Sequence, residues 1–418
     1  MKIYRVGGSV RDELLGRPVA DRDWVVVGAT PEILIASGYK PVGRDFPVFL
    51  HRDTGEEYAL ARTERKHGRG YRGFEFFASP DVTLEEDLAR RDLTINAMAR
   101  DERGTLIDPY GGQSDLRAGV LRHVSPAFVE DPLRVLRVAR FAARLGFVVA
   151  PETRRLMREL VATGELVELA PERIWQELAK GLLEPNPARM LAVLRDCGAL
   201  AQLLPEVDVL YDASSRARRS KAAPGARLSV ALEHAAKRRY ALPVRYAVLA
   251  HDFIGSPMPP QGGGARAQTM RDARRAEAMS ARLKVPVECR DAARLMARWH
   301  RIVVRAPALQ PAVVLGVISA ADALRRPERL GTLLHACACV AMTAPGAPDD
   351  FAPARYMTAA LAVVKGVAAG AIARAAAQKP GLPASARADT IAKAVRSARL
   401  EALRAWKRTG NAGRPPPK

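Results

Sequence analysis

The sequence has few cysteines, few aromatic residues and no long apolar run. Its four cysteines form no CxxC pair, so the chain supports neither a disulfide framework nor a zinc ribbon. The N-terminus lacks the apolar stretch and the small-residue cleavage site of a secretory signal. The most apolar later stretch, 361–373, contains Lys365 and is too short to span a bilayer. We therefore expect a soluble, reduced, cytoplasmic protein with no membrane partner.

Acidic residues are scarce relative to basic ones. The chain carries 66 Lys and Arg against 45 Asp and Glu, a formal net charge of +21. Such a surplus favours a polyanionic partner, a nucleic acid or a phosphate-rich substrate, over a neutral metabolite, although charge also serves solubility. With 48% hydrophobic and 27% charged residues the chain is globular. Its length corresponds to roughly two to four domains.

The hydrophobic pattern divides the chain into an α/β head and a helical body. We expect strands at 3–8, 23–28, 47–51, 56–61 and 74–78, and helices at 9–16 and 30–37. From Asp131 onward, apolar residues recur at helical spacing in four stretches, 133–145, 152–164, 172–183 and 188–200. Segments 211–227, 255–268 and 342–355 have the composition of linkers. The expected class is α+β, a mixed sheet with helices followed by an extended all-α body.

A glycine pair lies where the first expected strand meets the first expected helix. Gly7 and Gly8 are followed by Arg11 in the run GGSVRD. Backbone N–H groups at such a turn can bind a phosphate, and Arg11 can add a charge-assisted contact. The run matches neither GxGxxG nor a P-loop, because no GK[ST] follows.

Two carboxylates open the next expected strand. Asp21 and Asp23 are separated by one residue, so both side chains point to the same face of a strand. Adjacent carboxylates repel each other unless a cation lies between them, and hard oxygen ligands suit Mg²⁺ carried with a triphosphate. We therefore expect Asp21 and Asp23 to be both the catalytic residues and the Mg²⁺ ligands.

Together, GGSVRD and DRD resemble the signature of the DNA polymerase β nucleotidyltransferase superfamily. Within it, the chain resembles the class II tRNA nucleotidyltransferases, the CCA-adding enzymes, of bacterial type. Four further blocks match in order: RRDLTINAMA (90–99), DPYGG (108–112), EDPLRVLRVARFAARLGF (130–147) and PERIWQEL (171–178). The resemblance implies template-independent addition of CCA to the 3′ end of tRNA from CTP and ATP, with release of pyrophosphate. It implies no obligate protein partner.

The resemblance also assigns roles to residues after the glycine pair. Arg91 and Asp92 would contact phosphate and ribose, and Arg137 and Arg140 would hold the triphosphate. It divides the chain into a catalytic head (1–125), a helical neck for base recognition and RNA binding (126–205) and a helical body and tail (206–418). Taken alone, arginines spaced three apart on a helix indicate an exposed basic face.

In the resemblance, Asp131 and Arg134 read the incoming base by its Watson–Crick edge. Cytosine and adenine both offer an amine to Asp131 and a ring-nitrogen acceptor to Arg134, whereas guanine and uracil reverse that order. Polar groups left unpaired can reject the wrong base by a factor of ~10⁴. Asp131 followed by a proline also predicts a helix N-cap with proline at the first helical position.

Two features near the expected site stay open. A third carboxylate is expected, and Glu56 or Glu57 is the candidate. The stretch 62–72, rich in Arg, Lys and Gly, is either a mobile loop near the site or a solvated hairpin.

The second half resembles an HD phosphohydrolase domain only in part. His251-Asp252 is present, but the upstream stretch 225–232 has no histidine, His234 has the wrong spacing, and His300 has no obvious acidic neighbour. Two neighbouring ligands do not make a site that needs four or more. We expect a degenerate HD-like domain without hydrolase activity.

Three other functions compete with CCA addition. A bacterial poly(A) polymerase shares most head motifs; Asp45 argues against it, whereas the basic residues of 381–418 favour it. An enzyme that adds only C or only A is the second. A non-catalytic RNA-binding protein is the third, and the intact Asp21/Asp23 pair argues against that one.

Overall fold

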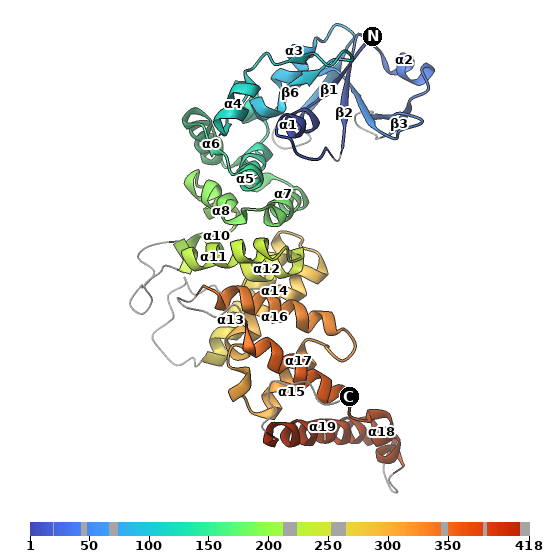
Figure 1. Cartoon of the computed structure of the whole chain (residues 1–418), viewed down its shortest axis with the longest axis vertical. Helices are drawn as coiled ribbons and strands as arrows, with labels where there is room; N and C mark the ends of the chain where they lie inside the picture. Colours follow the sequence, from blue (N-terminus) through green and yellow to red (C-terminus); the bar gives the residue numbers. More distant parts are fainter. Residues whose placement is uncertain are drawn as a thin grey trace. The chain divides into compact units, whose positions relative to one another are not determined.

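The computed structural model describes residues 1–19, 21–42, 48–66, 74–211, 224–251, 265–343, 350–378 and 383–409. The chain separates into two compact units, Met1–Pro205 and Glu206–Lys418, whose elements are labelled in Figure 1. Unit 1 contains the mixed sheet and unit 2 is helical in its described residues. The predicted α+β class is therefore confirmed. The finer division at residue 125 stays a prediction.

Unit 1 is built around a seven-stranded mixed sheet with the order β3-β4-β5-β2-β1-β8-β9. Its central strands β2 and β5 run parallel, and the other neighbouring pairs run antiparallel. The strands are β1 (Lys2–Val6), β2 (Asp23–Val27), β3 (Lys40–Val42), β4 (Val48–Leu50), β5 (Glu57–Leu60), β8 (Ala99–Arg100) and β9 (Leu106–Ile107).

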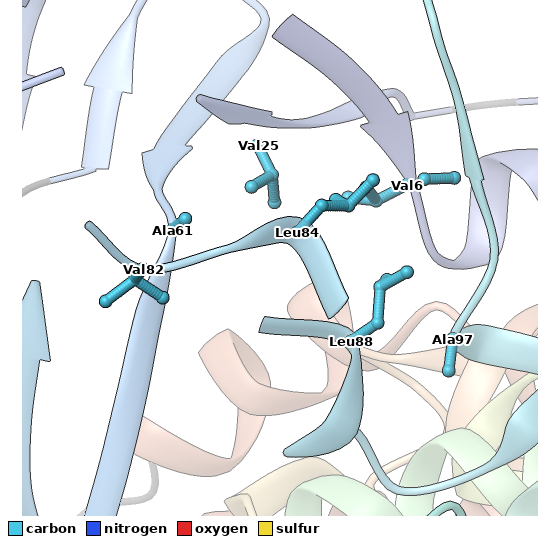
Figure 2. Close-up of a cluster of buried hydrophobic side chains, with 8 residues drawn as sticks. Val6, Val25, Ala61, Val82, Leu84, Leu88 and Ala97 are labelled. Atoms are coloured by element: carbon cyan, nitrogen blue, oxygen red, sulfur yellow. The ribbon is translucent and has the colours of Figure 1, made fainter. Parts of the chain in front are cut away.

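The two faces of the sheet bury different clusters because successive strand residues point to opposite sides. Val25 packs with Val6 and with Leu84 and Leu88 from helix α3 (Leu84–Ala89), as Figure 2 shows. Its neighbour Val26 packs on the other face, in a cluster that includes Leu34, Phe49 and Tyr58. A central strand buried on both faces explains the uninterrupted apolar run in 24–27.

Helices α1 and α2 flank the sheet, and a helical layer follows it in sequence. Glycine at position 146, with φ 76°, ends α5 in the left-handed conformation that favours glycine. The four helices predicted from periodicity after Asp131 are confirmed. The helices of unit 1 besides α3 are α1 (Gly8–Leu14), α2 (Pro31–Ala36), α4 (Gly112–Ala118), α5 (Leu133–Leu145), α6 (Pro151–Ala162), α7 (Pro171–Leu183), α8 (Pro187–Asp196) and α9 (Ala199–Leu203).

The stretch after β5 forms the hairpin alternative in its described part. β6 (Arg62–Lys66) pairs antiparallel with β7 (Phe74–Ala78), and residues 67–73 lie outside the described residues. A second small pairing, β10 (Val120–Leu121) with β11 (Val148–Val149), is parallel and precedes α6.

The described part of unit 2 consists of helices. The predicted linkers 211–227 and 342–355 are too long at their C-terminal ends. Helices α11 (Pro224–Lys237) and α17 (Ala352–Lys365) begin inside them with a proline in the first turn, where proline is tolerated. The third is too long because α13 begins at Ala265. The helices are α10 (Pro205–Asp208), which begins at the unit boundary, α11 (Pro224–Lys237), α12 (Leu242–Leu249), α13 (Ala265–Arg282), α14 (Val287–Val303), α15 (Pro311–Ala320), α16 (Pro327–Ala341), α17 (Ala352–Lys365), α18 (Ala369–Ala377) and α19 (Ala384–Arg408).

Among the described residues, no single helix has the length and apolarity needed to cross a membrane. The bent pair α17 and α18 meets that test jointly, by length and composition only.

Candidate active site

A cavity of about 620 Å³ in unit 1 brings together the ten residues that the sequence assigned to catalysis, metal binding and nucleotide binding, but neither candidate for the third carboxylate. These ten residues are Gly8, Arg11, Asp21, Asp23, Arg91, Asp92, Asp131, Arg134, Arg137 and Arg140. Eight others complete the lining: Gly7, Arg90, Asn96, Leu133, Phe141, Arg144, Arg173 and Lys180.

The cavity is strongly cationic. Nine of its lining side chains are arginine or lysine and four are aspartate, a formal surplus of five positive charges. Like charges gathered in a partly enclosed cavity are unfavourable unless an anion binds among them. The lining therefore fits a polyanionic ligand.

The glycine turn makes room for an arginine. Gly7 has φ 71° and ψ −131°, a conformation that side chains rarely adopt. A Cβ atom added there would lie 2.9 Å from Nη1 of Arg91. Glycine at this position thus permits both the turn between β1 and α1 and the close approach of Arg91.

Arg91 is oriented by a buried carboxylate. Its Nη2 lies 3.1 Å from Oδ2 of Asp87, a residue on α3 that is fully buried and also binds Arg90. The Nε atom of Arg91 is buried and donates no hydrogen bond to the described residues. A buried donor without an acceptor at the wall of a cationic cavity is well suited to an anionic ligand.

A hydrogen-bond network links α1 to the RRD motif through Asn96. The amide oxygen of Asn96 accepts from Nη1 of Arg11 at 2.5 Å, and its Nδ2 donates to Oδ1 of Asp92 at 2.9 Å. Arg11 also donates its Nε–H to Asp12. Burial lowers the pKa of Arg11, and the charge of Asp12 opposes that shift.

Asp92 is held from three directions. Its Oδ1 accepts from the backbone of Leu93 and from Asn96, and its Oδ2 accepts from Nε of Arg137 at 2.7 Å. Burial would raise the pKa of Asp92, but the nearby Arg137 and these hydrogen bonds lower it to about 2. Asp92 in turn raises the pKa of Arg137.

The arginines of α5 do not form an exposed basic face. The interpretation that their spacing alone indicated is therefore wrong. Arg134 and Arg140 are only 6% and 8% exposed. Arg140 donates its Nε–H to Glu177 of α7 at 2.6 Å, and its guanidinium lies over the ring of Phe141. Arg137 and Arg140 each use Nε for a carboxylate, which leaves their terminal nitrogens available to a ligand in the cavity.

Arg134 is held differently from the other two. Its Nη1 and Nη2 donate to the backbone carbonyls of Ala127 and Arg90, at 2.8 and 2.6 Å. These contacts fix the guanidinium plane but leave its Nε–H and one hydrogen on each terminal nitrogen for a ligand.

The predicted N-cap at Asp131 is displaced by one residue. α5 begins at Leu133 with Pro132 at the N-cap, and Asp131 ends a short 3₁₀ helix, Pro126–Glu130. The carboxylate still satisfies a free donor, because its Oδ1 accepts from the backbone N–H of Leu133 at 3.0 Å. Its Oδ2 lies 3.4 Å from Nη2 of Arg173.

Asp21 and Asp23 both line the cavity and both are exposed to it. Burial raises the pKa of Asp23, Arg91 opposes this shift, and the charge of Asp21 adds to it.

The sheet gives different positions to Glu56 and Glu57, the two candidates for the third carboxylate. Glu57 pairs in register with Asp23 on the parallel strand, whereas Glu56 accepts from the indole of Trp24, whose side chain points to the opposite face from Asp23.

Sequence reasoning missed several lining residues. Arg144 continues the arginine series of α5 by one more turn, and its spacing could have revealed it. Arg173 and Lys180 are seven residues apart on α7, which places both on one helix face. Asn96 belongs to a recognised motif but has no charge that would single it out.

Unit 2 places His300 beside His251, which the sequence did not predict. The two buried imidazoles are 5.3 Å apart between ring centroids. Their Nδ1 atoms lie 2.6 and 2.9 Å from the carbonyls of Val248 and Met296. Burial and His251 lower the pKa of His300 to about 3.

No group of three or more metal-ligating side chains occurs among the described residues. Asp252, from the expected HD pair, and Asp45 lie outside the described residues.

Comparison with known proteins agrees with this geometry. The family described as "Poly A polymerase head domain" matches residues 3–122, and "Probable RNA and SrmB-binding site of polymerase A" matches residues 146–210. A multifunctional CCA protein of Azoarcus sp. (strain BH72) is 55% identical over 406 residues, covering 95% of this chain and 98% of that protein. One of Laribacter hongkongensis (strain HLHK9) is 51% identical, covering 98% and 99%.

The chain belongs to the family of multifunctional CCA proteins. The crystal structure of the Bacillus stearothermophilus CCA-adding enzyme in complex with CTP matches with a TM-score of 0.62 and 27% identity, over 98% of this chain and 94% of that one. A CCA-adding enzyme in complex with ATP matches with a TM-score of 0.64 over 96% and 88%, and at 21% identity it shows the fold alone. The resemblance to CCA-adding nucleotidyltransferases predicted from the motifs is confirmed.

Proposed function

We propose that this protein adds or repairs the 3′-terminal CCA of tRNA in the cytoplasm, using CTP and ATP without a nucleic acid template. The observation that carries the proposal is the single cavity that gathers a carboxylate pair, a cationic lining and the Asp131/Arg134 pair. A dead scaffold would have no need to keep these three groups together. Membership of the CCA family supports the same activity.

Arg137 and Arg140 bind the triphosphate in this proposal, within the cationic lining of the cavity. A nucleoside triphosphate carries roughly four negative charges, which the surplus of five positive charges in the lining can neutralise. Arg137 and Arg140 are fixed through Nε by Asp92 and Glu177, so their terminal nitrogens can point at phosphate oxygens. Groups oriented before the ligand arrives lose little entropy when it binds.

Asp131 and Arg134 select the base. Asp131 accepts a hydrogen bond from the exocyclic amine of cytosine or adenine, and Arg134 donates to the adjacent ring nitrogen. Guanine and uracil would face Asp131 with a carbonyl acceptor and Arg134 with a donor. Two polar groups left unpaired in a partly buried cavity reject these bases strongly. The anchoring of Arg134 on two backbone carbonyls suits it to such a geometric test.

Asp21 and Asp23 fit a divalent metal because they supply hard oxygen ligands, two residues apart at the start of β2, to the same cavity. Bound there, Mg²⁺ would lower the pKa of the tRNA 3′-hydroxyl and neutralise charge on the α-phosphate. The register beside Asp23 makes Glu57 the better candidate for the third carboxylate. Neither Glu56 nor Glu57 lines the cavity.

The reaction is an in-line displacement at the α-phosphorus. The 3′-hydroxyl oxygen of tRNA forms the new bond as the bond to the bridging oxygen breaks, and pyrophosphate leaves. Asp92 orients the ribose, while the arginines of α5 stabilise the negative charge that accumulates on the leaving group.

Helices in 146–210, the region that matches an RNA-binding family, carry exposed arginines that would contact acceptor-stem phosphates. Arg155 and Arg195 are two of them.

The test is gel-resolved extension of a tRNA transcript that lacks its CCA end, with Mg²⁺ throughout. CTP alone is expected to add two residues, and CTP with ATP to add three and stop. UTP and GTP are expected to add none. A long ladder with ATP alone would instead identify a poly(A) polymerase. A stop after two C residues when CTP and ATP are both present would identify a C-adding enzyme. A lack of extension with every nucleotide would favour an RNA-binding protein.

A further inference from the structure

One face of α7 supports the side chains that line the cavity. Arg173, Glu177 and Lys180 occupy positions i, i+4 and i+7, which lie on the same side of a helix. Arg173 contacts Asp131, and Glu177 contacts Arg140 on α5. This face of α7 therefore contacts Asp131, which the proposed function assigns to the base, and Arg140, which it assigns to the triphosphate.

The two residues assigned to base reading are held in different ways. Arg134 is anchored by backbone carbonyls, which no side-chain substitution removes. Asp131 has one oxygen on the backbone N–H of Leu133, and the only charged contact of its other oxygen among the described residues is Arg173. Of these two contacts, that with Arg173 is the one that a side-chain substitution can remove.

We propose that Arg173 is a specificity-determining residue that acts through Asp131, by fixing the carboxylate plane against which the incoming base is tested. This inference rests on the proposed function. With Oδ2 held, the carboxylate presents a fixed acceptor to the cavity and cannot turn away from a base that also presents an acceptor. Arg173 is a positioning residue, because its contact is with Asp131.

Removal of Arg173 should weaken selection in two ways. A carboxylate held only through Oδ1, by the backbone N–H of Leu133, can rotate more widely and loses part of its preorganised hydrogen bond to the amine of cytosine. The same rotation relieves the repulsion between Asp131 and the O4 carbonyl of uracil. Cytosine and uracil have nearly the same size. The ratio of kcat/KM for CTP to kcat/KM for UTP therefore measures selection by hydrogen bonding and not by steric fit.

The neighbouring ion pair supplies a matched control. Glu177 lies one turn after Arg173 and binds Arg140 with both side chains buried, at 10% and 7% exposure for Arg140 and Glu177. Glu177→Gln removes the charge from that pair without touching Asp131. It should raise KM for CTP and UTP alike, because it loosens a residue assigned to the triphosphate, and should leave their ratio within about twofold of the unsubstituted protein.

The experiment measures kcat/KM for CTP and UTP on a tRNA transcript lacking its CCA end, using the full chain with Mg²⁺. Arg173→Ala is expected to lower the CTP/UTP ratio at least about tenfold. Arg173→Lys, which restores a cation near Asp131, is expected to fall between Arg173→Ala and the unsubstituted protein. Arg173→Gln removes the charge but keeps most of the side chain. If circular dichroism shows that Arg173→Ala does not fold, Arg173→Gln is expected to lower the CTP/UTP ratio in its place.

An unchanged CTP/UTP ratio in folded Arg173→Ala or Arg173→Gln would overturn the inference and leave the proposed function standing. An equal fall of the ratio in Glu177→Gln would also overturn it, because the effect would then belong to the packing of α7 in general. If the unsubstituted protein incorporates no CTP, the proposed function itself has failed.

Discussion

Arg137 donates its Nε–H to Oδ2 of Asp92 across 2.7 Å, and this ion pair joins helix α5 to the RRD motif. The carboxylate is almost fully buried, so either charge would be costly without the other. One contact thereby holds the residue assigned to ribose and a residue assigned to triphosphate in the same geometry.

The Asp92 pair should make stability depend on pH. The folded-state pKa of about 2 lies below the ordinary value of 3.8, so ionised Asp92 stabilises the fold above pH 4, and this stabilisation is lost as the pH falls through 2. Asp92→Asn should lower the free energy of unfolding by about 2 kcal/mol at pH 7 and by about half of that at pH 3. Urea unfolding at both values measures this, and an equal loss at pH 7 and pH 3 would contradict it.

Asp23→Asn should abolish nucleotide addition while tRNA binding is largely retained. The amide keeps the shape of the side chain but removes the charge needed to hold a divalent cation. Extension assays and filter binding on the same preparation give the two quantities. Asp53→Asn, at an exposed turn of the same head, is the matched control and should retain activity. Residual addition by Asp23→Asn near that of Asp53→Asn would show the metal assignment to be wrong.

Asn96→Leu should weaken binding of both nucleotides without altering the choice between bases. The substitution removes the bridge between Arg11 and Asp92. The buried Nη1 of Arg11 loses this acceptor, at a cost of about 1–3 kcal/mol, and Oδ1 of Asp92 keeps only the backbone donor of Leu93. We expect KM for CTP and for ATP to rise about tenfold together. Asn96→Asp keeps an oxygen for Arg11 but sets a second carboxylate beside Asp92, and should be more damaging at pH 7 than at pH 5. A change in KM for only one nucleotide would contradict this role.

Unit 2 should bind no transition metal tightly. His251 and His300 each direct Nδ1 at a backbone carbonyl, and no larger ligand group accompanies them among the described residues. Calorimetric titration of the full chain with Ni²⁺ or Mn²⁺, in the presence of excess Mg²⁺ to occupy the head, should show no stoichiometric site. Tight binding that is lost in His251→Ala would show that the HD-like domain retains its metal.

Local pattern predicted much of unit 1. The stretch 133–145 coincides with α5, because its apolar spacing is a property of neighbouring residues. Asp21 and Asp23 both line the cavity as predicted, although β2 begins only at Asp23 and Asp21 lies in the segment just before it. These features depend on residues close in sequence.

The remaining features depend on pairing at long range. β3, β8 and β9 have two or three residues each, too few to show a period. The burial of Arg140 was missed because it arises from packing between α5 and α7, not from the sequence of α5. That of Arg134 was missed because its guanidinium contacts the carbonyls of Ala127 and Arg90, outside α5. His251 and His300 meet only through the fold of unit 2.

One cavity in unit 1 serves both nucleotides in the proposed function, and equilibrium competition between CTP and ATP tests this most directly. We expect one nucleotide bound per chain, complete displacement of labelled CTP by ATP, and the loss of both in Arg140→Ala. Simultaneous binding of CTP and ATP to one chain, or an Arg140→Ala variant that loses only one of them, would contradict the account.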